Sequence, residues 1–185
     1  MVSLEVVIIS VYITDNDIKV IAMINDKEHL LSILKAADFP YVLYEHAPVF
    51  TVDDMHLCKD IPGAHVKNLF LRDRKKTAYV LLTVKDDKRV DLLSLGKTLQ
   101  LDRLSFASSN DLIEKLNVQP GSVTPFAILN DQSKKITFFM DDDLLQEEYI
   151  SVHPMENTAT IRMKLADLLR FIEHSHGKKI EFMKL

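Results

Sequence analysis

Residues 65–84 read HVKNLFLRDRKKTAYVLLTV, the clearest β-strand signal in the chain. Two apolar runs within this stretch, Val66–Leu71 and Ala78–Val84, contain the valine, phenylalanine and tyrosine residues that favour strands. A polar turn, Arg72–Lys76, lies between them. The stretch therefore predicts two neighbouring strands joined by a polar turn.

Two polar residues, Lys67 and Asn68, interrupt the first of these apolar runs. Because successive side chains in a strand point to opposite faces, Asn68 is expected on the face of Val66 and Phe70. Lys67 is then expected beside leucines on the other face. A lysine in that position either extends to solvent from a strand end or is partly desolvated for a function.

Helical and strand patterns alternate on both sides of this stretch, which favours a compact α+β domain over a parallel βαβ array. The expected helices are Lys27–Ala37 with Asn25 as its cap, Thr51–Cys58, Asp91–Gln100, Ser108–Asn117, Asp142–Glu148 and Leu165–His174. The other expected strands are Tyr41–Glu45, Leu104–Ala107, a hairpin of Phe126–Leu129 with Ile136–Met140, Tyr149–His153, Thr158–Met163 and Ile180–Met183.

A length of 185 residues suits one domain with one core, and 47% hydrophobic with 27% charged residues is typical of a globular chain. The net charge of −4 excludes a strong nonspecific nucleic-acid binder, which would carry a basic excess. Only a local basic region, Arg72–Lys76 followed by Lys85–Arg89, could contact RNA. The single cysteine, Cys58, is expected to be a small buried hydrophobe, and a lone thiol suits a cytoplasmic location.

The N-terminal residues differ from the rest of the chain. The apolar run Val6–Ile13 is far shorter than a membrane span and lacks the features of a signal peptide, so no membrane association is expected. A normal domain start occurs at Met23. We therefore expect residues 1–22 to be an extension of unknown role and residues 23–185 to be the domain.

Most familiar catalytic constellations are absent from the sequence, which has no G-x-S-x-G elbow, phosphate loop or H-E-x-x-H motif. His174 and His176 are two residues apart and do not share a helix face as metal ligands would. The run Asp141–Asp143 suits a helix cap at least as well as a Mg²⁺ site. No metal is expected.

The segment Pro120–Phe126 places a glycine and two prolines around small polar groups just before an apolar run. Such a segment is conformationally restricted and can present backbone N–H groups to an oxyanion, although a plain tight connection has the same pattern. His153-Pro154 and Asn157-Thr158 add polar residues at another strand end.

Together and in order, five segments resemble the YbaK/prolyl-tRNA editing superfamily, over about Met23–Gly177. The segments are Tyr44–Thr51, Gly63–Asp73, Leu104–Ser108, Pro120–Phe126 with Asn130-Asp131, and His153–Thr158. The Lys67-Asn68 pair and the Gly121–Pro125 segment are most similar to the branch of freestanding alanyl-tRNA(Pro) deacylases. The resemblance implies a mixed, mostly antiparallel sheet or partial barrel with flanking helices. It also implies hydrolysis of an aminoacyl ester without a metal or cofactor.

By this resemblance, Lys67 would hold the 3′-terminal adenosine or its phosphate together with the ester end of the substrate. The Gly121–Pro125 segment would supply backbone N–H donors to the ester carbonyl. The hydroxyl groups of Ser122 and Thr124 would be further hydrogen-bond partners beside Gly121. Asn68 would contact the aminoacyl group, which requires a bulge because strict alternation turns Asn68 to the other face. The substrate's own ribose hydroxyl would help activate water. The other expected substrate-binding residues are Phe50, Ser108, Pro125, Asn157 and the size-limiting His153.

The resemblance implies that the substrate is the acceptor end of mischarged tRNA(Pro). Because the sequence resembles the alanyl-tRNA(Pro) deacylases most, the implied aminoacyl group is alanine. The acidic net charge suggests that a partner such as prolyl-tRNA synthetase or an elongation factor helps to deliver it. Other small aminoacyl-tRNAs, such as Cys-tRNA(Pro), remain open because a size filter depends on one or two methylene groups. A non-catalytic aminoacyl-tRNA or ligand-binding module and a metal-assisted hydrolase also remain open.

Overall fold

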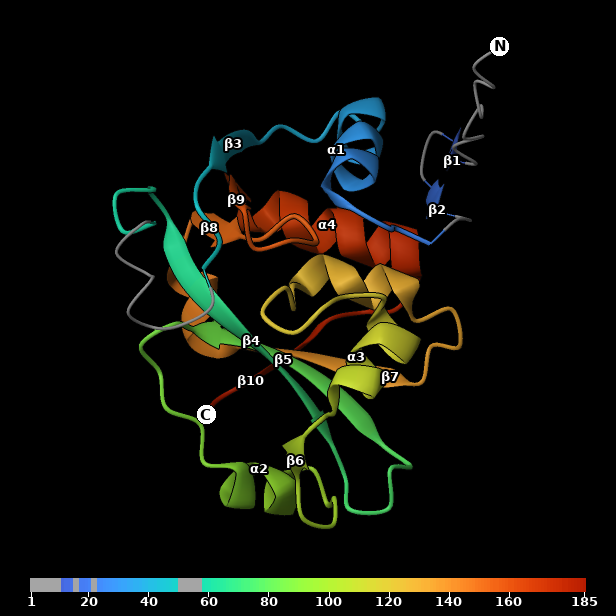
Figure 1. The fold of residues 1–185 in the computed structure, drawn as a ribbon, viewed down its shortest axis with the longest axis vertical. Coiled ribbons are helices and arrows are strands. Elements are labelled where there is room, and N and C mark those ends of the chain that lie inside the picture. The colour runs from blue at the N-terminus through green and yellow to red at the C-terminus, as the bar shows by residue number, and fades with distance from the viewer. Residues whose placement is uncertain (1–10, 15–16, 21–22, 50–57) are drawn as a thin grey trace.

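The computed structural model describes residues 11–14, 17–20, 23–49 and 58–185. Figure 1 shows these residues arranged as a twisted sheet with helices packed against it. The helices are α1 (Lys27–Ala36), α2 (Leu92–Thr98), α3 (Ser109–Leu116) and α4 (Leu165–His176), with short 3-10 helices at Pro125–Asn130 and Asp142–Gln146. The strands are β1 (Val11–Thr14), β2 (Asp17–Val20), β3 (Val42–Glu45), β4 (Ala64–Arg72), β5 (Tyr79–Lys85), β6 (Ser105–Phe106), β7 (Ile136–Asp141), β8 (Tyr149–Val152), β9 (Ala159–Lys164) and β10 (Glu181–Met183).

In the part of the chain that the structure describes, eight strands form one mixed sheet in the order β10-β7-β5-β4-β8-β9-β3, with β6 paired to β4. The predicted hairpin is its centre, because β4 and β5 pair antiparallel from Val66↔Lys85 to Arg72↔Tyr79. The pairs β4–β6, β8–β9 and β3–β9 are also antiparallel, whereas β5–β7, β7–β10 and β4–β8 are parallel. The expected α+β domain with a mixed, mostly antiparallel sheet is confirmed.

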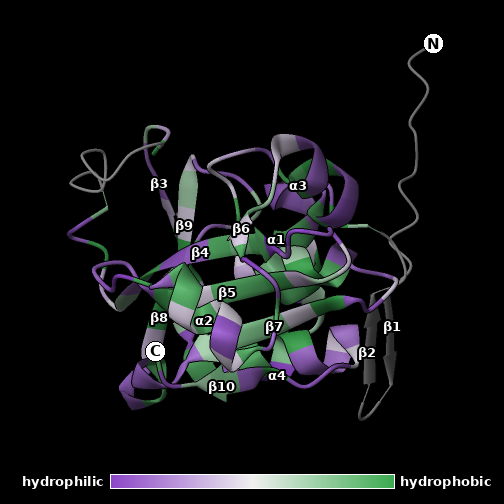
Figure 2. Ribbon diagram, turned by 90° about the horizontal axis from the view of Figure 1, so that it is seen from below, coloured by the Kyte–Doolittle hydropathy of each residue, from purple (hydrophilic) through white to green (hydrophobic). Residues whose placement is uncertain are grey.

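The two faces of the sheet are covered by different elements. On one face, Phe70, Leu81 and Ile150 pack in the main core with helices α1, α3 and α4. On the other face, Leu71, Leu82 and Val84 pack with Leu95 of α2. Figure 2 shows hydrophobic residues concentrated along β4, β5 and β7, between these layers. The prediction that successive side chains of β4 point to opposite faces of the sheet is therefore confirmed.

Two local expectations are wrong. The cap of α1 is Asp26, whose carboxylate accepts the amide N–H of His29 at 2.8 Å, because the residue directly before the helix is the one that reaches its third amide. Asn25 instead accepts a hydrogen bond from Asn117. The expected strand Phe126–Leu129 is part of a 3-10 helix, Pro125–Asn130, that is buried along its whole length. A short run that is buried on all sides has no periodicity to separate a strand from a helix.

Other expectations concern the N-terminal region. β1 and β2 pair antiparallel, and β2 contacts α4. The boundary between an extension and a domain at residue 22 stays a prediction. The expected helix Thr51–Cys58 lies outside the described residues up to position 57. Across the described ranges, each helix is too short or too polar to cross a membrane.

Candidate active site

One edge of β4 has different partners at its two ends. β8 pairs with Ala64 and His65, and β6 pairs with Leu71 and Arg72. Among the strands that the structure describes, none pairs with residues 66–69 along this edge, while β5 pairs with the other edge from Val66 to Arg72. We call this stretch the unpaired edge of β4. It contains the Lys67-Asn68 pair, and it is a gap inside the sheet where the backbone groups of β4 have no neighbouring strand among those described.

Two of the expected substrate-binding residues lie at the ends of this unpaired edge. The parallel register Ala64↔Ile150 and His65↔Ser151 places His153, just beyond β8, level with Lys67. At the other end, the amide of Ala107 donates to the carbonyl of Phe70 at 2.9 Å, and Ser108 follows. Ser108 also caps α3, where it exchanges hydrogen bonds with Asp111. The fold therefore brings residues about forty positions apart to either end of one short stretch of β4.

The Pro120–Phe126 segment is joined to both sides of this region. The side-chain amide of Asn68 donates to the carbonyl of Val123 at 3.1 Å, and the amide oxygen of Asn68 accepts the hydroxyl of Thr83 at 2.7 Å. The hydroxyl of Thr124 donates to the backbone carbonyl of His153 at 2.6 Å. Thr124 and Thr83 are fully buried, so these bonds are shielded from water. The segment is thereby fixed against β4 and the end of β8.

Within this segment the polar groups have different surroundings. Gly121 has φ +87°, a left-handed conformation that favours glycine, and is exposed. Ser122 is buried, and its amide donates to the carbonyl of Gln119 at 3.0 Å. Among the described residues, no backbone group accepts from the amides of Gly121 or Val123. Pro125 follows as the first residue of the buried 3-10 helix, where its missing N–H has no cost.

Lys67 and Asn68 leave β4 on opposite faces. The β4–β5 register runs one-to-one from Val66 to Arg72 without a bulge, so the bulge required to bring both side chains together is not present. Lys67 is opposite Val84, on the α2 face, and its ammonium donates to the carbonyl of Asp86 at 2.8 Å. Asn68 is opposite Thr83, on the side of the Pro120–Phe126 segment. Lys67 is half-buried, so its charge remains accessible.

Three histidines gather at the same end of the sheet: His65 lies in β4, and His46 and His153 directly follow β3 and β8. The rings of His46 and His153 have centroids 6.1 Å apart. His46 contacts the hydroxyl of Thr160 at 2.9 Å, and His153 contacts the carbonyl of Ala159 at 2.9 Å through Nδ1. Burial lowers the pKa of His153, the hydrogen bond to the Ala159 carbonyl opposes this shift, and the neighbouring His46 and His65 add to it, so the neutral ring is favoured. A neutral, partly buried ring suits the wall of a pocket for a small group.

His46 and His65 were not among the expected site residues. The available signal was their position, since each of the three histidines lies within two residues of a strand end. Cys58 lies nearby in a small apolar cluster with Val49 and Ile61. It is buried, and desolvation raises the pKa of its thiol, so the prediction of a buried hydrophobe is confirmed.

Two further expected residues lie around this region. Asn157 is buried, and its side-chain amide donates to the carbonyl of Val49 at 3.1 Å while the Val49 amide donates back to the Asn157 carbonyl at 3.1 Å. Asn157 therefore holds the chain just before position 50. Phe50 itself lies outside the described residues.

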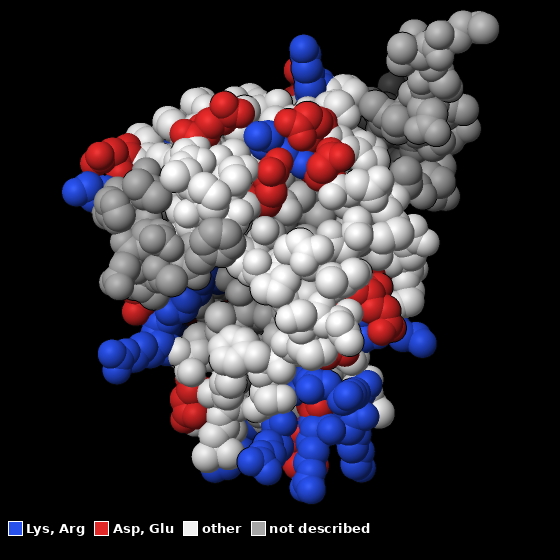
Figure 3. Space-filling view, viewed as in Figure 1, with Lys and Arg blue, Asp and Glu red and all other residues white. Residues whose placement is uncertain are grey.

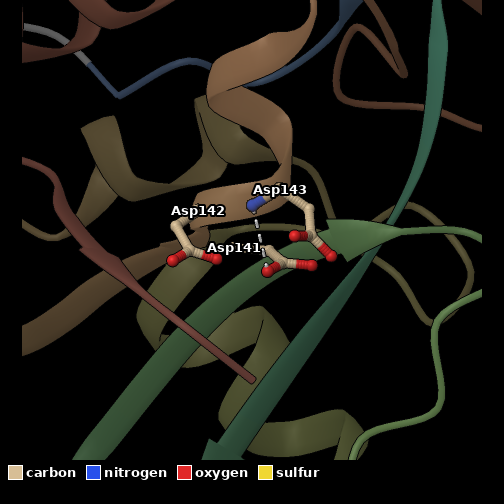
Figure 4. A group of neighbouring side chains, drawn as sticks. All are labelled: Asp141, Asp142 and Asp143. Carbon is tan, nitrogen blue, oxygen red and sulfur yellow. Dashed lines mark hydrogen bonds between the residues drawn. The ribbon is translucent and has the colours of Figure 1, made fainter.

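The acidic run Asp141–Asp143 offers three carboxylate oxygens within 4.8 Å of one another (Figure 4). The ammonium of Lys88 lies 2.8 Å from Asp141 and 2.8 Å from Asp143. Burial opposes the charge of Lys88, but these bonds outweigh it and raise its pKa, and they lower the pKa of Asp143. Asp141 also caps the following 3-10 helix. Lys88 therefore supplies a positive charge to Asp141 and Asp143, whereas one buried carboxylate oxygen of Asp141 and one of Asp142 have no hydrogen-bond partner among the described residues.

A family model described as an aminoacyl-tRNA editing domain matches residues 46–171. The prolyl-tRNA editing protein ProX of Acetoanaerobium sticklandii is 34% identical over 161 residues, covering 86% of this chain and 97% of that protein. The prolyl-tRNA synthetase associated domain-containing protein 1 of Danio rerio is 35% identical over 159 residues, covering 84% of this chain and 85% of its own length.

Solved structures share the fold. The crystal structure of a proposed trans-editing enzyme for prolyl-tRNA synthetase superimposes with a TM-score of 0.63 at 18% identity, covering 89% of this chain and 99% of that one. The crystal structure of a hypothetical protein, APE2540, gives a TM-score of 0.62 at 19% identity and covers 83% of this chain and 97% of that one. At these identities the likeness concerns the architecture alone.

Proposed function

Because the chain belongs to the aminoacyl-tRNA editing domain family, we propose that it is an aminoacyl-tRNA deacylase that acts in trans on mischarged tRNA(Pro), with alanine as its preferred aminoacyl group. The observation that carries the proposal is the arrangement around the unpaired edge of β4. Lys67, the Gly121–Pro125 segment and His153 come from three distant parts of the sequence and lie around one stretch of strand. The relatives named for prolyl-tRNA editing support tRNA(Pro) as the substrate.

The proposed reaction needs a water molecule, an oxyanion site and a positively charged group for the tRNA end. Water attacks the ester carbonyl carbon, the bond from that carbon to the ribose oxygen breaks, and the ribose oxygen takes up a proton. The amides of Gly121 and Val123 are the proposed donors to the oxyanion, since no described backbone group uses them. The hydroxyl of Ser122 is a further proposed donor, whereas the hydroxyl of Thr124 is engaged by the carbonyl of His153 and holds the segment in position.

Lys67 would bind the 3′-terminal adenosine or its phosphate from the α2 face of the sheet. Its half-buried ammonium donates to only one described backbone carbonyl, that of Asp86, which leaves donors for a phosphate. Asn68 would act differently. Since its amide joins Thr83 to Val123, it would position the oxyanion segment from the opposite face. The vicinal ribose hydroxyl of the substrate would help to activate the water molecule.

Selectivity for alanine would be steric. A synthetase pocket built for proline rejects a smaller side chain by only about 1–3 kcal/mol, roughly 10–200-fold, so a second site that excludes proline completes the discrimination. His153 would limit the size of that site, with Ser108, Pro125, Asn157 and Phe50 as further substrate-binding residues. The prediction is that His153→Ala raises the activity on bulkier esters. Unchanged discrimination in this variant would contradict the steric role.

The test is deacylation of tRNA(Pro) charged separately with alanine, cysteine and proline, with and without EDTA. We expect chelator-insensitive hydrolysis of the alanyl ester, loss of this activity in Lys67→Ala, and retention in Lys35→Ala. Lys35 is a matched control because it is an exposed lysine in the last turn of α1. Preferred hydrolysis of the cysteinyl ester would show that the reaction is as proposed but that the substrate is Cys-tRNA(Pro). If no ester is hydrolysed, the protein is a non-catalytic binding module. If EDTA abolishes the activity, the protein is a metal-assisted hydrolase.

A further inference from the structure

The basic region of the sequence divides into two turns with different surroundings. In the turn after β5, Lys85 lies 2.6 Å from Glu147, and Lys88 lies 2.8 Å from both Asp141 and Asp143. These two ammonium groups are neutralised within the protein, whereas Arg89 at the end of the same turn is exposed. An ion pair of this kind leaves little net charge for a polyanionic partner.

The turn between β4 and β5 has the opposite character. Arg74, Lys75 and Lys76 are exposed, and exposed Arg103 joins them from the connection between α2 and β6. Within the described residues, none of these four pairs with a carboxylate. We call the four residues the turn patch. Figure 3 shows a concentration of Lys and Arg side chains at this end of the molecule, below the sheet in the orientation of Figure 1.

The turn patch is held in place by backbone contacts. The amide of Arg74 donates to the carbonyl of Asp102 at 2.9 Å, which joins the two loops. Buried Asp73 turns inward, where its carboxylate accepts the amides of Thr77 and Ala78 at 2.7 and 3.0 Å. These bonds, of which that from Ala78 has the largest effect, lower the pKa of Asp73. The one carboxylate in this turn therefore supports the loop and does not pair with the patch.

The shape of this surface also suits a phosphate group. A hollow of about 310 Å³ is lined by Arg72, Asp73, Arg74, Lys76, Arg103 and Ser105. Arg72 is already engaged, since it lies 3.4 Å from Asp111. The remaining cations that line the hollow, Arg74, Lys76 and Arg103, come from two loops. Convergent basic groups around a hollow are the arrangement that positions nucleic-acid phosphates without reading bases.

The turn patch is joined to the candidate active site by β4 itself. Lys67 lies in the unpaired edge and Arg72 at the patch end, five residue steps along the strand, roughly 17 Å at about 3.3 Å per residue. That distance corresponds to roughly five nucleotides along one strand at about 3.4 Å each. A nucleic acid with its 3′ end at the unpaired edge of β4 can therefore extend its helical part to the patch.

We propose that the turn patch binds the phosphate backbone of the acceptor stem while the 3′ end of the same RNA enters the candidate active site. This inference rests on the proposed function for the identity of the RNA, but the charge, the hollow and the distance are properties of the fold. It explains how a chain with a net charge of −4 binds a polyanion. Affinity comes from four cations on two adjacent loops, and the binding is sensitive to salt.

The test compares Lys75→Gln/Lys76→Gln with Lys35→Gln/Lys179→Gln, a pair of exposed lysines outside the patch that gives the same change in net charge. Lys76 has φ 58°, which is equally unfavourable for lysine and glutamine, so the patch variant should keep its melting temperature. The probe is a fluorescent acceptor-stem minihelix of tRNA(Pro) that ends in CCA and carries no amino acid. Its affinity is measured by anisotropy over a range of NaCl concentrations, beside KM and kcat for the alanyl ester.

We expect the patch variant to bind the minihelix on the order of 10-fold or more weakly at low salt, with a log–log salt slope smaller by about one per lysine removed. KM should rise in parallel while kcat is unchanged, and the control variant should match the wild type. If the patch variant has the same affinity and salt slope as the wild type, the proposal that the turn patch binds RNA is wrong, and the deacylase proposal is unaffected. If the wild type hydrolyses no ester, the proposed function fails, and the minihelix comparison still decides whether the patch binds RNA. If the wild type does not bind the minihelix, the proposal that the turn patch binds the acceptor stem is also wrong.

Discussion

The buried hydroxyl of Thr124 donates a 2.6 Å hydrogen bond to the backbone carbonyl of His153, 29 residues further along the chain. The bond fixes the glycine- and proline-rich segment against the end of β8. It also explains why Thr124 does not cap the 3-10 helix that follows, since no side-chain cap bond is formed there. The position of the proposed oxyanion donors therefore depends on a contact with the proposed size-limiting residue.

Replacing Thr124 with valine should destabilise the protein and impair catalysis together. The carbonyl of His153 would be left without its buried donor, at a cost of about 1–3 kcal/mol in the free energy of unfolding. Thr124→Ser keeps the hydroxyl and should lose less. Urea denaturation measures the stability, and kcat/KM for the alanyl ester measures the effect on the segment. Equal kcat/KM in the two variants would show that this bond does not position the segment.

Asn68 should act through Thr83 and Val123. Removing its side chain in Asn68→Ala leaves the fully buried Thr83 hydroxyl without its acceptor, so we expect a loss of about 1–3 kcal/mol in the free energy of unfolding. In Thr83→Val the hydroxyl is already absent, so adding Asn68→Ala should then cost clearly less. A double-mutant cycle followed by urea denaturation measures this coupling. If the effects of Asn68→Ala and Thr83→Val on the free energy of unfolding are additive, the two side chains do not act together.

The pH dependence of stability should follow the buried histidines. Burial lowers the pKa of His153 and of His176, so the unfolded chain binds protons at these positions before the folded protein does. The free energy of unfolding should therefore fall as the pH is lowered below about 6.5, the ordinary value for histidine, until the folded pKa is passed. The pKa of Asp111, held at about 2, keeps this carboxylate ionised throughout that range.

The measurement is chemical denaturation at several pH values on either side of this window. His153→Gln should flatten the dependence in part, and adding His176→Gln should flatten it further. A slope that stays the same in the double variant would assign the pH dependence to other groups.

Lys88 should be essential to the acidic run beside it. Asp141 is fully buried, so Lys88→Met would leave its carboxylate without a cation and cost about 3–5 kcal/mol in the free energy of unfolding. Asp143 is more than half exposed, and Asp143→Asn should cost less than about 1 kcal/mol. Neither Mg²⁺ nor EDTA should change the stability of the wild type. Recovery of Lys88→Met by Mg²⁺ would show that the run is a cation site that lysine occupies.

Several elements of the fold follow directly from local patterns. The β4–β5 hairpin and the helices α3 and α4 lie where the sequence predicted them, because periodicity and capping side chains act over a few residues. The segment Pro125–Asn130 did not follow, because its burial comes from contacts with α4 and α3. Asn130 shows the cause: it bonds the backbone of Ile24 and Leu116, both distant in sequence.

The candidate site divides in the same way. The sequence by itself identified Lys67, Asn68, the Gly121–Pro125 segment and His153 as unusual, and alternation alone predicted that Lys67 and Asn68 would point to opposite faces. Only the tertiary structure decided that β8 and β6 leave residues 66–69 without a strand partner, that His46 and His65 lie beside His153, and that Lys85 and Lys88 are neutralised while Arg74–Lys76 are not. The physical reason is that side-chain direction is a property of neighbouring residues, whereas strand pairing and charge compensation depend on residues brought together from tens of positions away.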